Sequence, residues 1–267
     1  MTGTFFGEAL SYGGIVFKLL LIAKLWRLRL LKQYPVLVTY LLFSLARSAA
    51  NAYLLQTQAR LFGLSGYNLL YVVSQPVLWV LYFLLILELY SLMLRDFTGI
   101  RRLGRLILFS SLAGTTLACC AVMALDRREG AFQYPFMAYW VLQERSVFFC
   151  LSALTVLLVL FVCHFQLPVA RNVWILCGSF GGYFILYSLL LVQWRYLGDG
   201  FRFIRDLLNG LFFFVALLAP VVCLSKAGES QAQLIGIFRR RRTEELELAL
   251  LSRLRGLDRA LGELLKA

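Results

Sequence analysis

The chain has 267 residues, of which 61% are hydrophobic and 15% charged, and its formal net charge is +13. An ordinary soluble domain is only about 45–50% apolar, so this composition, with a mean hydropathy of +0.77, excludes that class. Long apolar runs, rather than the short alternating segments of an outer-membrane barrel, predict an all-α polytopic membrane protein.

Seven apolar stretches that are long enough to cross a bilayer follow one another along the chain. We place them at residues 5–26, 35–56, 67–94, 103–125, 134–165, 171–194 and 201–224. Residues 1–225 are therefore the predicted seven-helix transmembrane domain. Residues 226–242 are predicted to be a basic cytoplasmic linker, and residues 243–267 a short amphipathic helix.

Basic residues concentrate in alternate connections between these spans. The loops at 24–32 and 95–105 and the tail are strongly basic, whereas the loop at 126–129 is neutral. By the positive-inside rule the N-terminus is outside and the C-terminus cytoplasmic in a plasma membrane. The absence of an N-x-S/T sequon favours a bacterial inner membrane. Because the positive charge lies beside apolar spans and no base-stacking motif accompanies it, we expect lipid rather than nucleic acid as its partner.

Several spans carry sequence features that affect helix packing. Pro76 lies inside the third span and is expected to kink it. Gly178 and Gly182 form a GxxxG pair in the sixth span, a pattern typical of close helix contacts. In the second span, polar residues spaced by three and four share one helical face. They are Tyr40, Ser44, Arg47, Ser48 and Asn51.

Polar residues of several spans fall at one depth in the outer half of the predicted membrane. Counted at about 1.5 Å per residue, Gln75, Glu144 and Asn209 all lie about 14 Å below the outer boundary. We predict a polar cavity lined by these three and by Arg47, Asn51, Tyr71, Arg145, Tyr187, Arg205 and Asp206. Its three arginines and two carboxylates would suit a small anionic or zwitterionic ligand. The alternative is a closed ion-pair network that only stabilises the bundle.

Lys18 and Glu88 form a second candidate group, nearer the cytoplasmic boundary. By the same count both lie about 10–12 Å from that boundary, and we predict a buried ion pair. The alternative is that each side chain extends separately to the interface.

The C-terminal segment contains a leucine seam with the 4-3-4-3 spacing of a heptad repeat. Its residues are Leu250, Leu254, Leu257, Leu261 and Leu264. The seam predicts a coiled-coil contact with a second copy or another protein. Because the basic run at 238–242 precedes it, a helix lying on anionic lipid is an equally good prediction.

No cofactor or metal is expected. The six cysteines form no CxxC pair, His164 is the one histidine, and hydrolase and nucleotide-binding motifs are absent. Seven spans with an outside N-terminus resemble the microbial opsins in topology, but the seventh span lacks the lysine that retinal attachment requires. The leading functional prediction is a receptor-like sensor with output through the C-terminal helix. A transporter or channel for a small anionic solute comes second, and an enzyme third.

Overall fold

The computed structural model describes residues 2–57, 60–61, 64–95, 135–165, 169–197, 202–230 and 232–233, together with a few single residues elsewhere. These residues are mostly helical. Three helical segments are long and apolar enough to cross a membrane, namely Leu70–Met93, Gln143–His164 and Arg171–Leu191. A shorter apolar helix runs from Leu207 to Cys223. The predicted class of helical membrane protein is therefore supported.

Long helices occupy six of the predicted spans within the described ranges. They are α1 (Thr2–Arg27), α2 (Pro35–Thr57), α3 (Gly66–Met93), α5 (Pro135–Phe165), α6 (Arg171–Leu197) and α7 (Arg202–Cys223). Each observed end lies within three residues of its predicted limit. The predicted span 103–125 lies almost entirely outside the described residues.

Short elements complete the described chain. Helix α8 (Ala227–Ser230) follows α7. Strands β1 (Arg60–Leu61) and β2 (Leu64–Ser65) form an antiparallel hairpin between α2 and α3. Strand β3 (Val169–Ala170) pairs with β4 (Ala232–Gln233), so the chain beyond α8 is tied to the start of α6.

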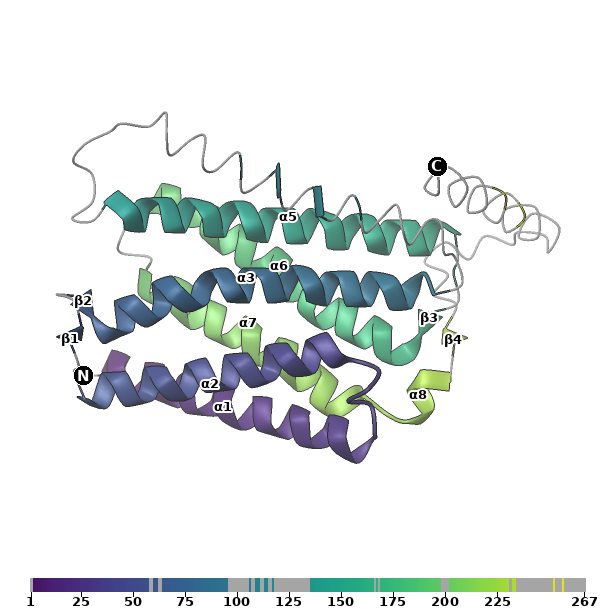
Figure 1. Ribbon diagram of the computed structural model, residues 1–267, viewed down its shortest axis with the longest axis horizontal. Helices are drawn as coiled ribbons and strands as arrows, with labels where there is room; N and C mark the ends of the chain where they lie inside the picture. The colour runs from purple at the N-terminus through teal and green to yellow at the C-terminus, as the bar shows by residue number, and fades with distance from the viewer. Residues whose placement is uncertain are drawn as a thin grey trace.

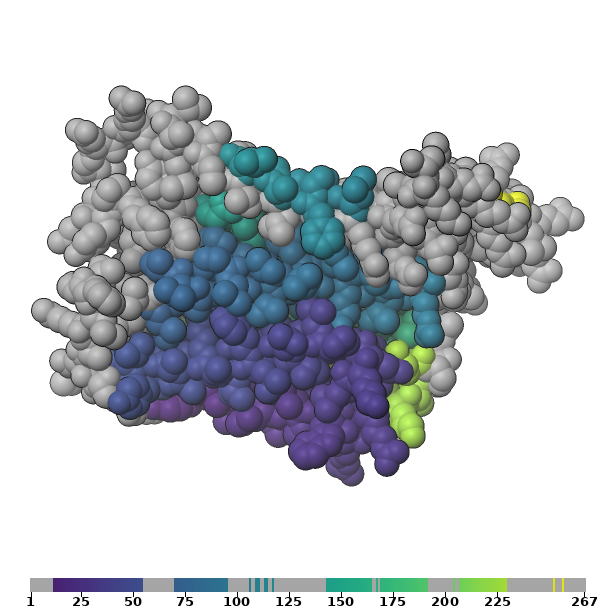
Figure 2. Space-filling model, viewed as in Figure 1, coloured from purple at the N-terminus to yellow at the C-terminus, as the bar shows by residue number. Residues whose placement is uncertain are grey.

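The axes of the long helices run roughly along the longest dimension of the molecule (Figure 1). Each of these helices contacts the next one in the order α1, α2, α3, α5, α6, α7, and α7 contacts α1, so they form a ring. Helix α3 also touches α6 across the ring. Large apolar side chains such as Leu20, Leu157 and Val215 face outward. This exposure is what lipid contact requires. Figure 2 shows α1, α2 and α3 side by side on one face, with α8 at one end.

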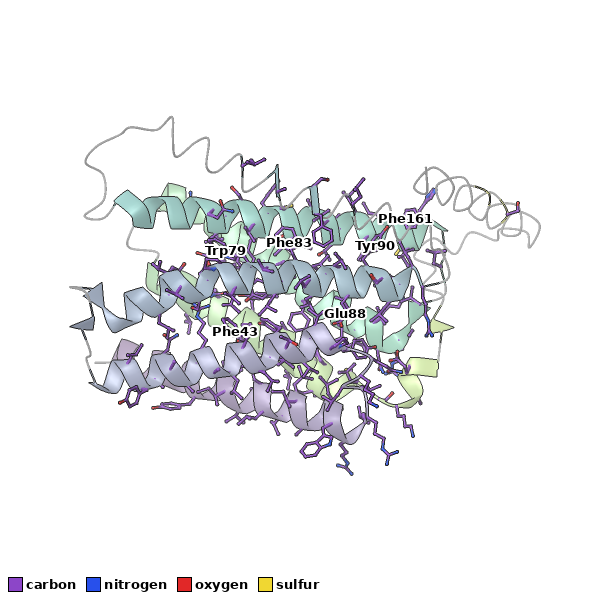
Figure 3. All side chains as sticks on the ribbon, in the orientation of Figure 1. Phe43, Trp79, Phe83, Glu88, Tyr90 and Phe161 are labelled. Carbon is purple, nitrogen blue, oxygen red and sulfur yellow. The ribbon has the colours of Figure 1, made fainter. Side chains whose placement is uncertain are left out.

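Buried aromatic side chains pack between the helices; Trp79 and Phe83 of α3 are two that Figure 3 labels. The Tyr82 ring lies 5.2 Å from Tyr40, 5.6 Å from Phe148 and 5.2 Å from Phe184, measured between centroids. Phe180 meets Tyr40 edge to face at 5.9 Å. We call Tyr40, Tyr82, Phe148, Phe180 and Phe184 the aromatic layer. They come from α2, α3, α5 and α6 and join those helices into one core.

The close approach of α5 and α6 occurs at Gly181 rather than at the predicted GxxxG pair. A Cβ on Gly181 would overlap Thr155 Cγ2, so a side chain does not fit there without a shift of α5 or α6. Gly178 is exposed, and neither it nor Gly182 has a neighbour within 4 Å of a Cβ position. Rotation of α6 about its axis has placed Gly181 against α5 and turned Gly178 outward.

Exposed basic side chains gather where α1, α3 and α7 end and α2 and α6 begin. They are Arg27, Arg29, Lys32, Arg95, Arg171 and Lys226. We call this region the basic end of the bundle. It contains the described parts of the connections that the sequence assigns to the cytoplasm.

Candidate functional site

Glu144 is the centre of a polar cluster built by three helices. It lies on α5, is buried, and accepts hydrogen bonds from Tyr71 Oη at 3.1 Å and from Gln75 Nε2 at 3.0 Å, both on α3. Tyr187 Oη on α6 donates at 3.1 Å to the oxygen that also receives Gln75. Side chains predicted from depth alone are thus brought into direct contact, and the buried carboxylate has the partners that its desolvation demands.

Two further predicted residues join the cluster through aromatic neighbours. The Arg47 guanidinium, on α2, lies over the Tyr71 ring at 5.6 Å from its centroid, within cation–π range. Tyr183 Oη donates to Asn209 Oδ1 at 3.3 Å, and the Tyr183 ring stacks on Tyr187 at 5.8 Å. The cluster therefore extends from α2 to α7.

This part of the bundle also contains buried side-chain oxygens that could accept further hydrogen bonds. Gln75 Oε1 and Ser74 Oγ, both on α3, have no hydrogen-bond partner among the described residues. Asn51 Oδ1, one turn beyond Arg47 on α2, is in the same state. Buried oxygens in native proteins are normally paired. These positions can accept hydrogen bonds from water or a ligand.

The remaining predicted site residues lie beside the cluster or outside the description. Arg145 follows Glu144 on α5 and is half-buried. The side chains of Arg205 and Asp206 lie outside the described residues, as do the leucines of the predicted heptad seam. Among the described residues, no three His, Cys, Asp or Glu side chains are grouped to hold a metal ion.

The predicted ion pair between Lys18 and Glu88 is wrong, because each group has other partners. Lys18 Nζ donates to Ser48 Oγ at 2.8 Å and to the Ser44 carbonyl oxygen at 3.3 Å. Glu88 accepts instead from the amides of Val36 and Leu37, at 2.9 and 3.1 Å. Lys18 is on α1 and Glu88 on α3, and α2 stands between these helices in the ring.

A second polar cluster at the basic end, absent from the sequence-based prediction, fixes the chain that follows α7. Tyr34 Oη donates to Glu229 Oε2 at 2.8 Å, and Asn172 Nδ2 donates to the same oxygen at 3.1 Å. Asn172 also exchanges hydrogen bonds with the main chain of Ser225, at 2.8 and 3.2 Å. We call Tyr34, Asn172, Ser225 and Glu229 the latch.

Burial within the latch affects the ionisation of Tyr34. Tyr34 and Asn172 are both fully buried. Burial raises the pKa of the Tyr34 hydroxyl well above its ordinary value, and the nearby Glu229 carboxylate adds to this shift. In the sequence, Asn172 lies one position inside the span 171–194, and Glu229 comes soon after the last span. Hydrophobic periodicity alone does not distinguish such polar residues from ordinary surface residues.

Two cavities lined by described residues also lie at the basic end, with volumes of about 410 and 310 Å³. Neither includes a residue of the Glu144 cluster. Comparisons with protein-family models, with curated proteins and with solved structures found no match to this chain. Its function is therefore argued from these clusters.

Proposed function

We propose that this chain is a seven-span membrane sensor that binds a small anionic or zwitterionic ligand beside Glu144. The buried Glu144 cluster supports this proposal. Charged residues inside membrane spans are costly, and they mark functional sites more often than they serve packing alone. Here one carboxylate receives donors from α3 and α6, with Arg47 of α2 one aromatic ring away.

The polar atoms around the cluster favour a particular ligand class. The planar guanidinium of Arg47 is suited to a carboxylate or phosphate. The unused oxygens of Gln75 and Asn51 accept hydrogen bonds and so favour an ammonium or hydroxyl group. A zwitterion such as an amino acid presents both kinds of group and is our preferred ligand class.

The aromatic layer is the observation that favours a sensor over a transporter. A transported solute needs a polar path from the Glu144 cluster toward the basic end. Tyr82 and Phe148 follow Gln75 and Glu144 in that direction, and both are buried among other rings. Lys18 and Glu88, the candidates for a polar path, are held by α2.

The latch supplies a route for output in this proposal. It joins Tyr34 before α2 and Asn172 at the start of α6 to the chain that leads into the tail. A ligand that shifts α2 or α6 would change these hydrogen bonds. The predicted heptad helix at 243–267 would then transmit the change to a second copy or a partner protein.

The test measures ligand binding and output on one purified protein. Thermal shift against amino acids, small carboxylates and phosphates should identify a stabilising ligand, and Arg47→Gln and Glu144→Gln should weaken its binding at least tenfold. Arg171→Gln, at the opposite end, is the matched control and should bind normally. Hydrogen exchange at residues 225–233 should change when ligand is added.

A different pair of results would support the alternative function. Accumulation of the ligand inside sealed proteoliposomes, abolished by Glu144→Gln, would identify a transporter and contradict the sensor. If no compound in the panel shifts the melting temperature, while both substitutions lower it without ligand, the cluster is a closed structural network.

A further inference from the structure

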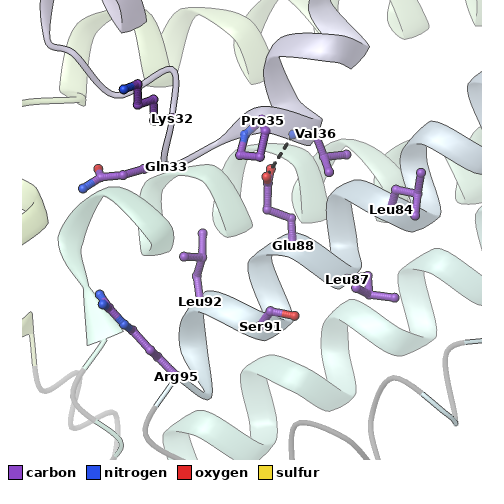
Figure 4. A pocket seen from close by; sticks show the side chains of 10 residues that line it. All are labelled: Lys32, Gln33, Pro35, Val36, Leu84, Leu87, Glu88, Ser91, Leu92 and Arg95. Atoms are coloured by element: carbon purple, nitrogen blue, oxygen red, sulfur yellow. Dashed lines mark hydrogen bonds between the residues drawn. The ribbon is translucent and has the colours of Figure 1, made fainter.

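The cavity of about 410 Å³ lies between the start of α2 and the last turns of α3 (Figure 4). Its volume falls in the range of small-molecule sites, roughly 300–1,000 Å³. Residues of α3 line one wall, and the turn before α2 lines another. The cavity is distinct from the Glu144 cluster, which shares none of its residues.

Two cations border this cavity from separate segments of the chain. Lys32 precedes α2 and Arg95 follows α3, and both side chains are exposed. Gln33 and Ser91 add groups that can form hydrogen bonds. This side of the cavity therefore has the composition of an anion site.

Glu88 also lines the cavity, but its carboxylate is directed at the start of α2. Both oxygens accept backbone N–H donors, from Val36 and Leu37, and Figure 4 shows the bond to Val36. The side chain is only 9% exposed. Its charge is thus compensated by the amides and the dipole of α2, which leaves Lys32 and Arg95 available for an external anion.

Part of the cavity lining is apolar. Leu84, Leu87 and Leu92 belong to it, and all three are half-buried, so part of each side chain remains uncovered. The cavity lies at the end of the membrane-spanning segment Leu70–Met93, and Arg95 comes two residues later. Basic and apolar side chains thus meet where a bilayer passes from acyl chains to headgroups.

We propose that this cavity binds one anionic phospholipid, with its phosphate between Lys32 and Arg95 and an acyl chain on the three leucines. Basic pockets between spanning helices on the cytoplasmic side are suited to such headgroups. A soluble phosphate would satisfy the cations but leave the leucine surface uncovered. The inference does not depend on the ligand proposed beside Glu144.

The test titrates the full-length protein in neutral detergent with phosphatidylglycerol and reads bound lipid by native mass spectrometry. The double variant Lys32→Gln/Arg95→Gln should weaken the binding of phosphatidylglycerol about 30-fold. This factor corresponds to a loss of about 1 kcal/mol of binding free energy for each cation removed. Both side chains are exposed, so the variant should elute and melt as the native protein does. Leu87→Ala should also weaken the binding of phosphatidylglycerol.

The control variant Arg27→Gln/Arg171→Gln removes the same charge from the basic end but not from the cavity, and it should bind as the native protein does. An equal loss of phosphatidylglycerol binding in this control would contradict a specific site and would indicate general electrostatic attraction to the basic end. Equal binding of phosphatidylcholine would contradict headgroup selection. Glycerol 3-phosphate binding as tightly as the lipid, with Leu87→Ala unaffected, would show a free-phosphate site instead.

Discussion

Glu88 stabilises the start of α2, although it belongs to α3. The amides at the beginning of a helix have no intrahelical partner, and the Glu88 carboxylate takes two of them. Lys18 is bound by the polar face of α2 and lies 5.3 Å from the centre of the Phe213 ring. Each buried charge is therefore compensated separately.

This separation gives the first prediction. Glu88→Gln should lower the free energy of unfolding by about 1–2 kcal/mol, the size of a lost helix cap. Lys18→Met should also destabilise, and the double variant should show the sum of both losses. The measurement is thermal or denaturant unfolding in detergent. Recovery of stability in the double variant would show that the two groups interact after all.

Glu144 gives the second prediction, because three side chains donate to it. Glu144→Ala leaves the Tyr71, Gln75 and Tyr187 donors unpaired, and should lower the free energy of unfolding by about 2–4 kcal/mol. Glu144→Gln retains an acceptor and should cost about half as much. Melting temperatures of the two variants in the same detergent make the comparison. Equal losses would mean that the hydrogen bonds contribute little.

At the scale of elements, contacts between helices depend on which residues face one another. Thr155 is buried on α5, and its hydroxyl donates to the Leu151 carbonyl oxygen at 2.7 Å, which fixes its rotamer. The methyl group of this fixed side chain fills the space beside Gly181. The contact of α5 with α6 therefore tolerates no added atom there.

The third prediction compares two glycines of α6. Gly181→Ala should destabilise by about 1–3 kcal/mol, as overpacking does. Gly178→Ala has open space and should be neutral, or stabilising by up to about 1 kcal/mol through helix propensity. Unfolding of both variants under identical conditions checks this. A greater loss of stability for Gly178→Ala than for Gly181→Ala would show that the GxxxG pair forms the helix contact.

The latch gives the fourth prediction, concerning pH. Because the pKa of Tyr34 is raised in the folded protein, its stabilising effect is complete below the ordinary tyrosine value of about 10 and decreases as the pH rises above it. Tyr34→Phe should lack this decrease and, near neutral pH, lose about 0.5–1.5 kcal/mol for the missing hydrogen bond to Glu229. Stability measured from pH 7 to 11 tests both parts.

At the scale of the whole molecule, positive charge marks one end of the bundle. The exposed cations of the basic end come from the end of α1, the turn before α2, the chain just after α3, the start of α6 and the chain after α7. Placing this end in the cytoplasm satisfies the positive-inside rule. It also brings the proposed lipid cavity to the leaflet richer in anionic headgroups.

The fifth prediction tests this orientation. In a variant without the six native cysteines, Arg29→Cys and Lys226→Cys should resist an impermeant thiol reagent in intact cells and react after lysis. Arg60→Cys, in the connection between α2 and α3, should react from outside. The reverse pattern would invert the proposed topology.

The limits of the described helices follow from the sequence itself, because charged or proline residues bound the continuous apolar runs, as Pro35 does at the start of α2 and Arg171 at the start of α6. The class of helical membrane protein follows from the same runs. Depth was also predictable, since the rise of a helix is constant, and this grouped Glu144 with Gln75 and Tyr187.

The tertiary structure decided which faces meet, because sequence gives the height of a residue along its helix but not the rotation or the neighbours of that helix. Lys18 and Glu88 share a predicted depth, yet α2 lies between their helices and binds both. Gly181 was selected over Gly178 by the rotation of α6. The latch joins Tyr34 to Glu229, 195 positions apart, because the folded ring places the α1–α2 turn beside the end of α7.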